Sequence, residues 1–154
     1  MEEEKTLVNR VAASGLITLN LEDYFPTSEI ATFDIKDYLF HGLILREKDF
    51  RDALKQLDWS VYKDKIVLVN CSTDAVIPLW AYMLIENYLM HIATDTYQGT
   101  EEEYLRMFYR ETLENTDFTQ YQNQRIVIKG CGSAFDTIGP KPYVRRTMQY
   151  CSNF

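Results

Sequence analysis

The amino-acid sequence predicts a single α/β domain with a mixed, mainly parallel sheet flanked by helices. Strand-like and helix-like segments alternate from residue 58 onward, and no linker or low-complexity tract divides the 154 residues. With 46% hydrophobic residues, a chain of this length can bury a core without disulfides or metal. An internal repeat further predicts two tandem units of strand, Cys loop and helix, over residues 58–116 and 117–154, after an N-terminal portion over 1–57.

The repeat consists of an aromatic lead-in, an apolar strand, a cysteine, an acidic loop residue and a proline. Nine residues of the first unit return in order in the second: Asp58/Asp117, Trp59/Phe118, Tyr62/Tyr121, Ile66/Ile126, Val67/Val127, Leu68/Ile128, Cys71/Cys131, Asp74/Asp136 and Pro78/Pro140. One residue is inserted before the second apolar run and two after its cysteine, as expected where the loops of duplicated units drift. The second unit has no room for a final strand, which indicates an incomplete duplication or a clipped chain.

The N-terminal portion contains five predicted elements. Apolar residues at helical spacing predict a helix over residues 3–14 that ends at Gly15. Alternating apolar and polar residues predict strands over 16–21 and 30–35, and the turn signal between them favours a hairpin. A short strand is expected over 43–45. The apolar residues that follow at helical spacing predict a helix reaching Leu57, with Asp49 as its cap.

The repeat units supply the remaining elements. Ile66 to Val69 is an aliphatic run typical of a central strand covered on both faces. Pro78 fits the first turn of a helix that continues to about Tyr88. The chain then continues with a weaker strand over 91–97, a helix opened by the capping box of Thr100 and Glu103, a strand over 125–129, and a helix from Pro140 or Pro142 to Phe154.

Charge and composition restrict the partners and the compartment. A net charge of −7 and a pI near 4.8 disfavour binding to nucleic acid or to anionic lipids. The longest apolar run, residues 75–85, is far shorter than the roughly 20 residues that cross a bilayer. The acidic N-terminus lacks the features of a secretory signal, and three cysteines without close spacing argue against a disulfide framework. We therefore expect a cytoplasmic protein with reduced thiols.

Four segments carry a resemblance to a known family: residues 8–19, 33–39, 42–51 and 71–82. In these segments the chain resembles a conserved bacterial (Bacteroidetes-type) family classed as domain of unknown function 2480, and the resemblance extends over nearly the whole chain. It implies no reaction, cofactor or catalytic residue. It does imply that members of the family extend somewhat further at the C-terminus.

The candidate site lies at the strand ends, because ligands of α/β proteins bind at the carboxyl ends of the strands. The repeat places four residues there, Cys71, Asp74, Cys131 and Asp136, and His41 is a candidate neighbour. One hypothesis is a binding or scaffold module without chemistry, with a small-molecule ligand at the strand ends or a homo-oligomer formed through the aromatic surface. In that case the cysteines are core residues and the aspartates bind nearby amides.

The alternative is a thiol-dependent enzyme or redox protein. Cys71 would act as the nucleophile, with a pKa lowered by the amide dipoles of the following helix, and Asp74 would orient a partner. The sequence does not decide whether the chain is an enzyme. Strand order would set the distance between Cys71 and Cys131: about 4.8 Å, within disulfide range, if the repeat strands are neighbours, and roughly 10 Å if another strand lies between them.

A zinc site is a third hypothesis, built from Cys71, Cys131, His41 and Asp74 or Asp136. Structural zinc normally takes its ligands as closely spaced pairs, and this chain has none. The sequence therefore predicts no metal and no cofactor.

Overall fold

The computed structural model describes residues 15–129. The helices predicted over residues 3–14 and after Pro140 lie outside this range. The chain is a single α/β domain whose described residues divide into two compact units, one formed by 26–105 and the other by 15–25 with 106–129. Every strand pair in both units is parallel, so the predicted α/β class is confirmed.

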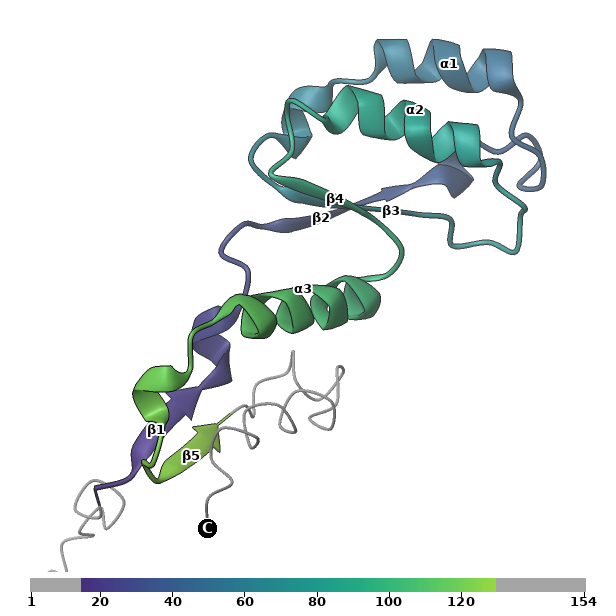
Figure 1. The fold of residues 1–154 in the computed structure, drawn as a ribbon. Helices are drawn as coiled ribbons and strands as arrows, with labels where there is room; N and C mark the ends of the chain where they lie inside the picture. Colours follow the sequence, from purple (N-terminus) through teal and green to yellow (C-terminus); the bar gives the residue numbers. More distant parts are fainter. Residues whose placement is uncertain (1–14, 130–154) are drawn as a thin grey trace, which may run out of the picture. The chain divides into compact units, whose positions relative to one another are not determined.

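Residues 26–105 form the three-stranded unit. Its sheet has the order β2 (Ile30–Asp34), β3 (Ile66–Asn70) and β4 (Asp95–Gln98). Helix α1 (Glu47–Gln56) connects β2 to β3, and α2 (Leu79–Leu89) connects β3 to β4. Both helices cover the same face of the sheet (Figure 1), because each right-handed crossover moves one strand further in the same direction.

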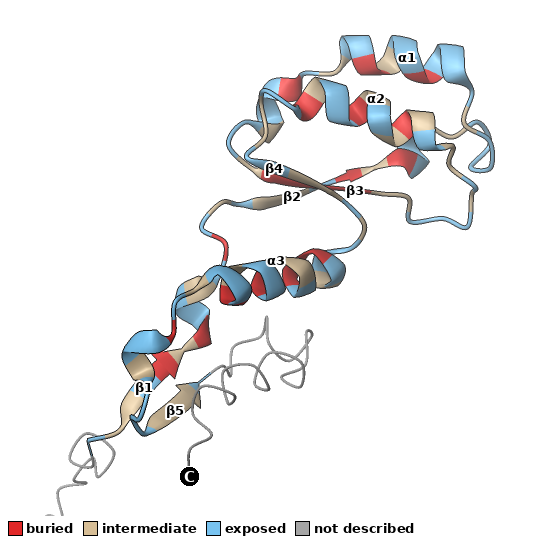
Figure 2. Cartoon of the chain, in the orientation of Figure 1, coloured by how far each residue is buried: buried red, intermediate tan, exposed pale blue. Residues whose placement is uncertain are grey.

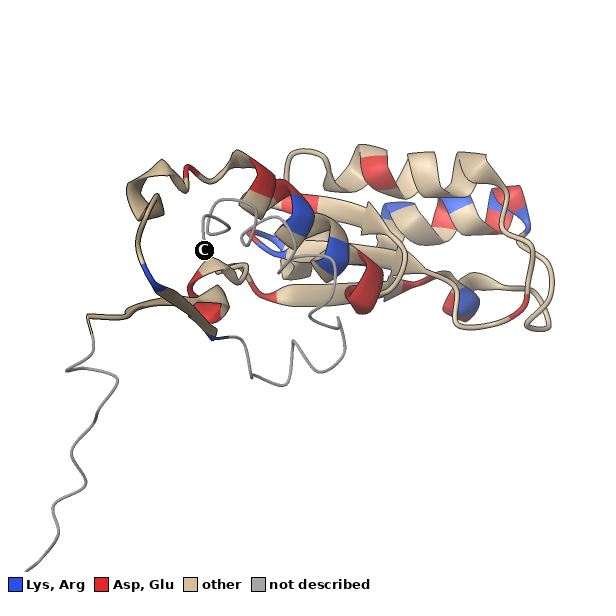
Figure 3. Ribbon diagram, turned by 60° about the horizontal axis from the view of Figure 1, so that its bottom comes forward, with Lys and Arg blue, Asp and Glu red and all other residues tan. Residues whose placement is uncertain are grey.

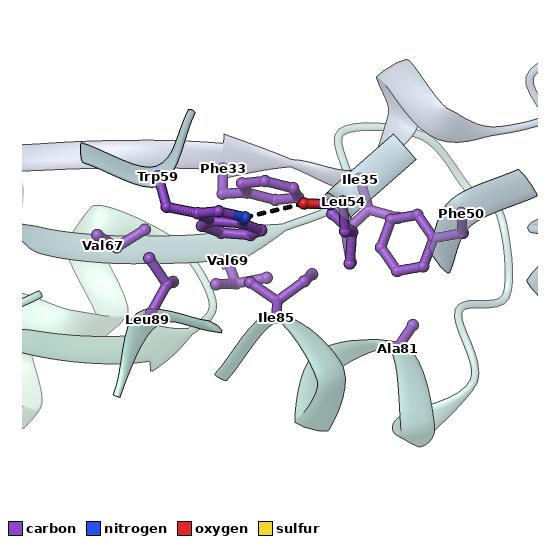
Figure 4. Close-up of a cluster of buried hydrophobic side chains, with 10 residues drawn as sticks. All are labelled: Phe33, Ile35, Phe50, Leu54, Trp59, Val67, Val69, Ala81, Ile85 and Leu89. Carbon is purple, nitrogen blue, oxygen red and sulfur yellow. Dashed lines mark hydrogen bonds between the residues drawn. The ribbon is translucent and has the colours of Figure 1, made fainter. Parts of the chain in front are cut away.

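The core of this unit lies between the sheet and the two helices. Its buried side chains, drawn in Figure 4, are Phe33, Ile35, Phe50, Leu54, Trp59, Val67, Val69, Ala81, Ile85 and Leu89. Within the cluster, the indole Nε1 of Trp59 donates a hydrogen bond of 2.9 Å to the carbonyl oxygen of Leu54. Ile66 and Leu68 alternate with the core-facing valines of β3 and are also buried, as Figure 2 shows for the strand as a whole. The prediction of a central strand covered on both faces is confirmed.

The remaining described residues form the two-stranded unit. Here β1 (Ile17–Asn20) pairs with β5 (Ile126–Lys129). Helix α3 (Glu101–Asn115) starts in the three-stranded unit and ends in this one. The predicted capping box opens it: the Thr100 amide donates to Glu103 Oε2 at 2.9 Å, and the Glu103 amide donates to the Thr100 hydroxyl at 3.4 Å.

The predicted hairpin of the first two strands is wrong. β1 pairs with β5 and β2 pairs with β3, so the two strands lie in different sheets. The side chains that end these strands explain the difference. Asn20 accepts a hydrogen bond from the Glu22 amide, and Asp34 accepts one from the Lys36 amide. Each bond starts a 3-10 turn, η1 (Leu21–Tyr24) or η2 (Ile35–Tyr38), in place of a hairpin loop.

Two further expectations in this region are wrong. The strand predicted over residues 43–45 is a tight turn, in which the Phe40 amide donates to the Ile44 carbonyl at 2.8 Å. The predicted cap Asp49 lies within the first turn of α1, and the N-cap position is held by Arg46 without a side-chain hydrogen bond. A carboxylate in the first turn interacts favourably with the helix dipole without capping it.

The predicted repeat of whole units is not confirmed, because its second loop and helix lie outside residues 15–129. Both strand orders considered from the sequence are wrong, because β5 pairs with β1 in the two-stranded sheet and pairs with neither β3 nor β4. The segments that precede β3 and β5 nevertheless contain equivalent hydrogen bonds, in each of which an aspartate accepts from the amide two residues later. Asp58 Oδ1 accepts from the Ser60 amide at 3.0 Å, before η3 (Trp59–Tyr62) and β3. Asp117 Oδ1 accepts from the Thr119 amide at 2.9 Å, before η4 (Thr119–Tyr121) and β5.

Candidate functional site

The candidate site is the edge of the three-stranded sheet where its parallel strands end. Asp34 lies opposite Asn70 in the register of β2 and β3, and Gln98 lies opposite Val69 in the register of β3 and β4. Two long loops leave this edge, one over residues 35–46 and one over 71–78. We call these strand ends and loops the carboxyl edge. In α/β folds, ligands bind outside such an edge.

Asp34 joins the two loops of the carboxyl edge. Its Oδ1 accepts hydrogen bonds from the Lys36 amide at 3.0 Å and from the Ser72 amide at 3.1 Å, and its Oδ2 lies 3.4 Å from Lys36 Nζ. Partial burial would raise the pKa of this carboxyl, but the hydrogen bonds from Ser72 and Lys36 outweigh that effect and lower the pKa to about 2. Asp34 is therefore an ionised anchor that holds the loop after β3 against the end of β2.

Cys71 lies directly after β3 and is half-buried. Its Sγ is 3.2 Å from the Thr73 hydroxyl, with which it shares a hydrogen bond. Tyr82 of α2 is also near: burial raises the pKa of its phenol, the charged form of Cys71 raises it further, and a hydrogen bond with Gln98 opposes both effects. Cys71 therefore packs against the hydrophobic core on one side, while its thiol contacts the polar side chains of the strand ends. Residues 72–78 separate it from the first turn of α2.

The Phe40–Ile44 turn forms the tip of the first loop. Its central residues His41 and Gly42 both have positive φ, 51° and 71°, as in a type I′ turn. Three large apolar side chains of this turn are exposed: Phe40 by 40%, Leu43 by 71% and Ile44 by 62%. The Arg46 guanidinium lies over the Phe40 ring, 3.1 Å from its centroid. The turn is a defined structure that presents apolar side chains to solvent.

Three of the five residues predicted for the site lie at the carboxyl edge. Cys71 and Asp74 share the loop after β3, and His41 lies in the loop after β2, where its ring contacts Phe40. Asp74 is exposed and makes no hydrogen bond within residues 15–129, whereas we expected it to bind nearby amides. Cys131 and Asp136 lie outside the described residues. The sequence analysis did not predict Asp34 as a site residue. Asp34 accepts hydrogen bonds from nearby backbone amides, as was expected of Asp74.

Within residues 15–129, no group of three or more histidine, cysteine, aspartate or glutamate side chains is arranged to hold a metal ion. The same part of the chain contains no helix that is both long and apolar enough to span a bilayer. The carboxyl edge offers hydrogen-bonding groups, exposed apolar side chains and one half-buried thiol.

Comparison with known proteins gives the family. A family model described as "Protein of unknown function (DUF2480)" matches residues 5–149. The chain belongs to this family. DUF2480 membership confirms the resemblance seen in the sequence, while the bacterial origin stays a prediction. No curated protein and no solved structure matches the chain, so the role of this DUF2480 protein has to be argued from its own residues.

Proposed function

We propose that this chain is a non-catalytic binding module that recognises an extended polypeptide segment at the carboxyl edge. One observation carries the proposal. The Phe40–Ile44 turn presents three exposed apolar side chains from the same sheet edge that carries the hydrogen-bonding loop after β3. A polypeptide offers both kinds of partner, because its side chains fit apolar surfaces and its backbone requires hydrogen bonds.

The apolar part of the edge is well ordered before any ligand binds. Reciprocal hydrogen bonds close the turn: the Phe40 amide donates to the Ile44 carbonyl at 2.8 Å, and the Ile44 amide donates to the Phe40 carbonyl at 3.3 Å. The stacked guanidinium of Arg46 supports the Phe40 ring. A surface that is already ordered loses less conformational entropy on binding than a flexible loop does. Exposed Leu43 and Ile44 are then suited to act as anchors in a partner's pocket.

The polar part of the edge is the loop after β3. Ser72, Thr73 and Asp74 are all exposed. The Ser72 amide is already used by Asp34, and the Thr73 hydroxyl is paired with Cys71. The Asp74 carboxylate has no hydrogen-bond partner within the described residues, so it is free to accept a backbone N–H group from a ligand.

Two features weigh against the thiol-enzyme alternative. The predicted activation required a helix N-terminus beside Cys71, but α2 begins only at Leu79, after the intervening loop. A nucleophilic cysteine also needs a base within hydrogen-bond reach, and neither His41 nor His91 forms a hydrogen bond to Cys71 in the described structure. The features at Cys71 fit a packing residue better than a nucleophile.

Display of random peptides against the full chain tests this proposal. Peptides selected on the wild-type protein are expected to bind Leu43→Glu at least about tenfold more weakly, because the glutamate places a charge where an apolar anchor is needed. Val61→Glu is the matched control: Val61 is an exposed apolar residue (54%) of η3, at the opposite end of β3. Cys71→Ser is expected to bind as wild type does. Equal affinity for Leu43→Glu, or lost binding in Cys71→Ser, would contradict the proposal.

A further inference from the structure

The two helices of the three-stranded unit differ in how many charged residues they contain. Both lie on the same face of the sheet and bury one side in the shared core. The exposed residues of α1 are charged or polar and include the ion pairs Arg51–Glu47 at 2.9 Å and Lys55–Asp52 at 3.1 Å. In contrast, α2 contains a single charged residue, Glu86. The contrast between the helices can be followed in Figure 3.

Apolar side chains form a stripe on the exposed side of α2, beside the exposed polar residues Glu86 and Asn87. Ala81, Ile85 and Leu89 face the core. Leu79, Met83 and Met90 lie on the opposite side at helical spacing and are exposed by 68%, 65% and 58%. Val76, just before the helix, is exposed by 91%. We call these four residues, Val76, Leu79, Met83 and Met90, the α2 face.

We propose that the α2 face is the contact surface of a homodimer. In a two-fold symmetric dimer the same patch meets itself, so the patch has to be self-complementary. An apolar patch satisfies this condition, because like side chains pack against one another without charge repulsion. This inference goes beyond polypeptide binding at the carboxyl edge and, apart from Val76 in the loop over residues 71–78, depends on residues outside that edge.

The charges near the α2 face allow a second copy to occupy it. Two copies that each carry a net charge of −7 repel one another over most of their surface. The α2 face itself has no charged member. The carboxylate of the nearby Glu86 is drawn toward β4, where the Thr96 hydroxyl lies 2.6 Å from both of its oxygens. Two copies can therefore meet through the four apolar side chains of the α2 face, with each exposed Glu86 carboxylate bound to Thr96 of its own copy.

The size of the α2 face is sufficient for a modest dimer. Four exposed aliphatic or methionine side chains contribute roughly 400 Å² of apolar surface, on the order of 100 Å² each. Homodimer interfaces are about 65% apolar, so this corresponds to roughly 600 Å² per copy and roughly 1,200 Å² in total. That is the lower limit of standard specific interfaces.

Sedimentation velocity of the full chain, between about 1 and 200 µM, tests the inference. We expect a monomer–dimer equilibrium in the wild type. Met83→Glu is expected to weaken dimerisation at least about tenfold, because two carboxylates would meet at the contact. Val61→Glu adds the same charge at another exposed apolar position and is expected to dimerise as wild type does. Leu43→Glu should also dimerise normally, which separates this contact from the carboxyl edge.

Methionine oxidation gives a second readout that does not depend on a variant. Met83 and Met90 are expected to become protected from peroxide as the concentration rises, whereas half-buried Met107 should oxidise at a rate independent of concentration. A wild-type chain that stays monomeric over the whole range would overturn the inference. A dimer that survives Met83→Glu, or in which Met83 stays unprotected, would equally overturn it.

Discussion

Replacement of Asp34 tests the account of how the carboxyl edge is held together. Asp34→Ala removes the acceptor of two backbone amides, those of Lys36 and Ser72, at 3.0 and 3.1 Å. Hydrogen bonds to a charged acceptor are worth about 1.5 to 3 kcal/mol when buried, and water replaces part of this at a side chain that is 20% exposed. We expect a loss of about 2 kcal/mol in the free energy of unfolding at pH 7. Asp34→Asn keeps an acceptor oxygen and should lose about 1 kcal/mol.

The pH dependence provides a second and sharper readout of Asp34. Its pKa is about 2 in the folded chain, below the ordinary aspartate value of 3.8, so its stabilisation is complete above about pH 4 and is lost as the pH falls toward 2. The full shift corresponds to roughly 2 kcal/mol, and solvent screening reduces this to about 1 kcal/mol.

Urea titrations from pH 7 down to pH 2 measure both effects. The difference between wild type and Asp34→Ala should shrink over the acidic part of this range. Asp74→Ala, which removes an exposed carboxylate without hydrogen bonds to the described residues, serves as the control and should match wild type. Parallel pH profiles for wild type and Asp34→Ala would refute the reasoning.

Three other substitutions have defined outcomes. Trp59→Phe removes the buried hydrogen bond to the Leu54 carbonyl and should cost about 1 to 3 kcal/mol of unfolding free energy in urea titrations; an unchanged midpoint would exclude that bond as a stabilising contact. Gly99→Ala should cost about 1 to 3 kcal/mol by the same assay, because Gly99 has a φ of 150° and an added Cβ would lie 2.7 Å from Glu103 Oε2; wild-type stability would contradict the tight approach seen there. Thr100→Ala removes one half of the capping box and should cost about 1 kcal/mol, with faster amide exchange in the first turn of α3; unchanged exchange would contradict the cap.

The sequence allowed the central elements to be predicted because their patterns have a single physical solution. Ile66 to Val69 are four consecutive aliphatic residues, which in a strand point alternately to the two faces of the sheet and favour burial of both. All four are buried in β3. The Thr100 and Glu103 pair likewise predicted the start of α3. Local chemistry was sufficient at these positions.

Strand partners could not be predicted, because pairing depends on contacts between residues far apart in the sequence. The turn signal after β1 suggested a hairpin, yet β1 takes β5, more than a hundred residues further along the chain, as its partner. A missed signal was present in the sequence. Residues 18–25 and 32–39 share one pattern, Thr-Leu-Asn-Leu-Glu-Asp-Tyr-Phe and Thr-Phe-Asp-Ile-Lys-Asp-Tyr-Leu. This correspondence would have predicted equivalent 3-10 turns after two equivalent strands, and it would have indicated Asp34 as an anchor.

The candidate site was predicted in position but only partly in its residues. The rule for the carboxyl ends of strands located the edge that carries Cys71, Asp74 and His41. The exposed apolar turn was missed because Leu43 and Ile44 have high strand propensity, and their exposure is a property of the folded chain. The lesson is that apolar residues in a βα loop should be considered as binding residues as well as core residues.

Hydrogen exchange of the full chain, with and without a peptide selected on it, is the most direct test of the carboxyl edge as a binding surface. Both samples should be measured at one protein concentration, so that any dimer is equally populated. The account predicts slowed amide exchange over residues 38–46 and 72–74, with residues around Val61 unchanged. Protection confined to other parts of the chain, with residues 38–46 unaffected, would contradict it.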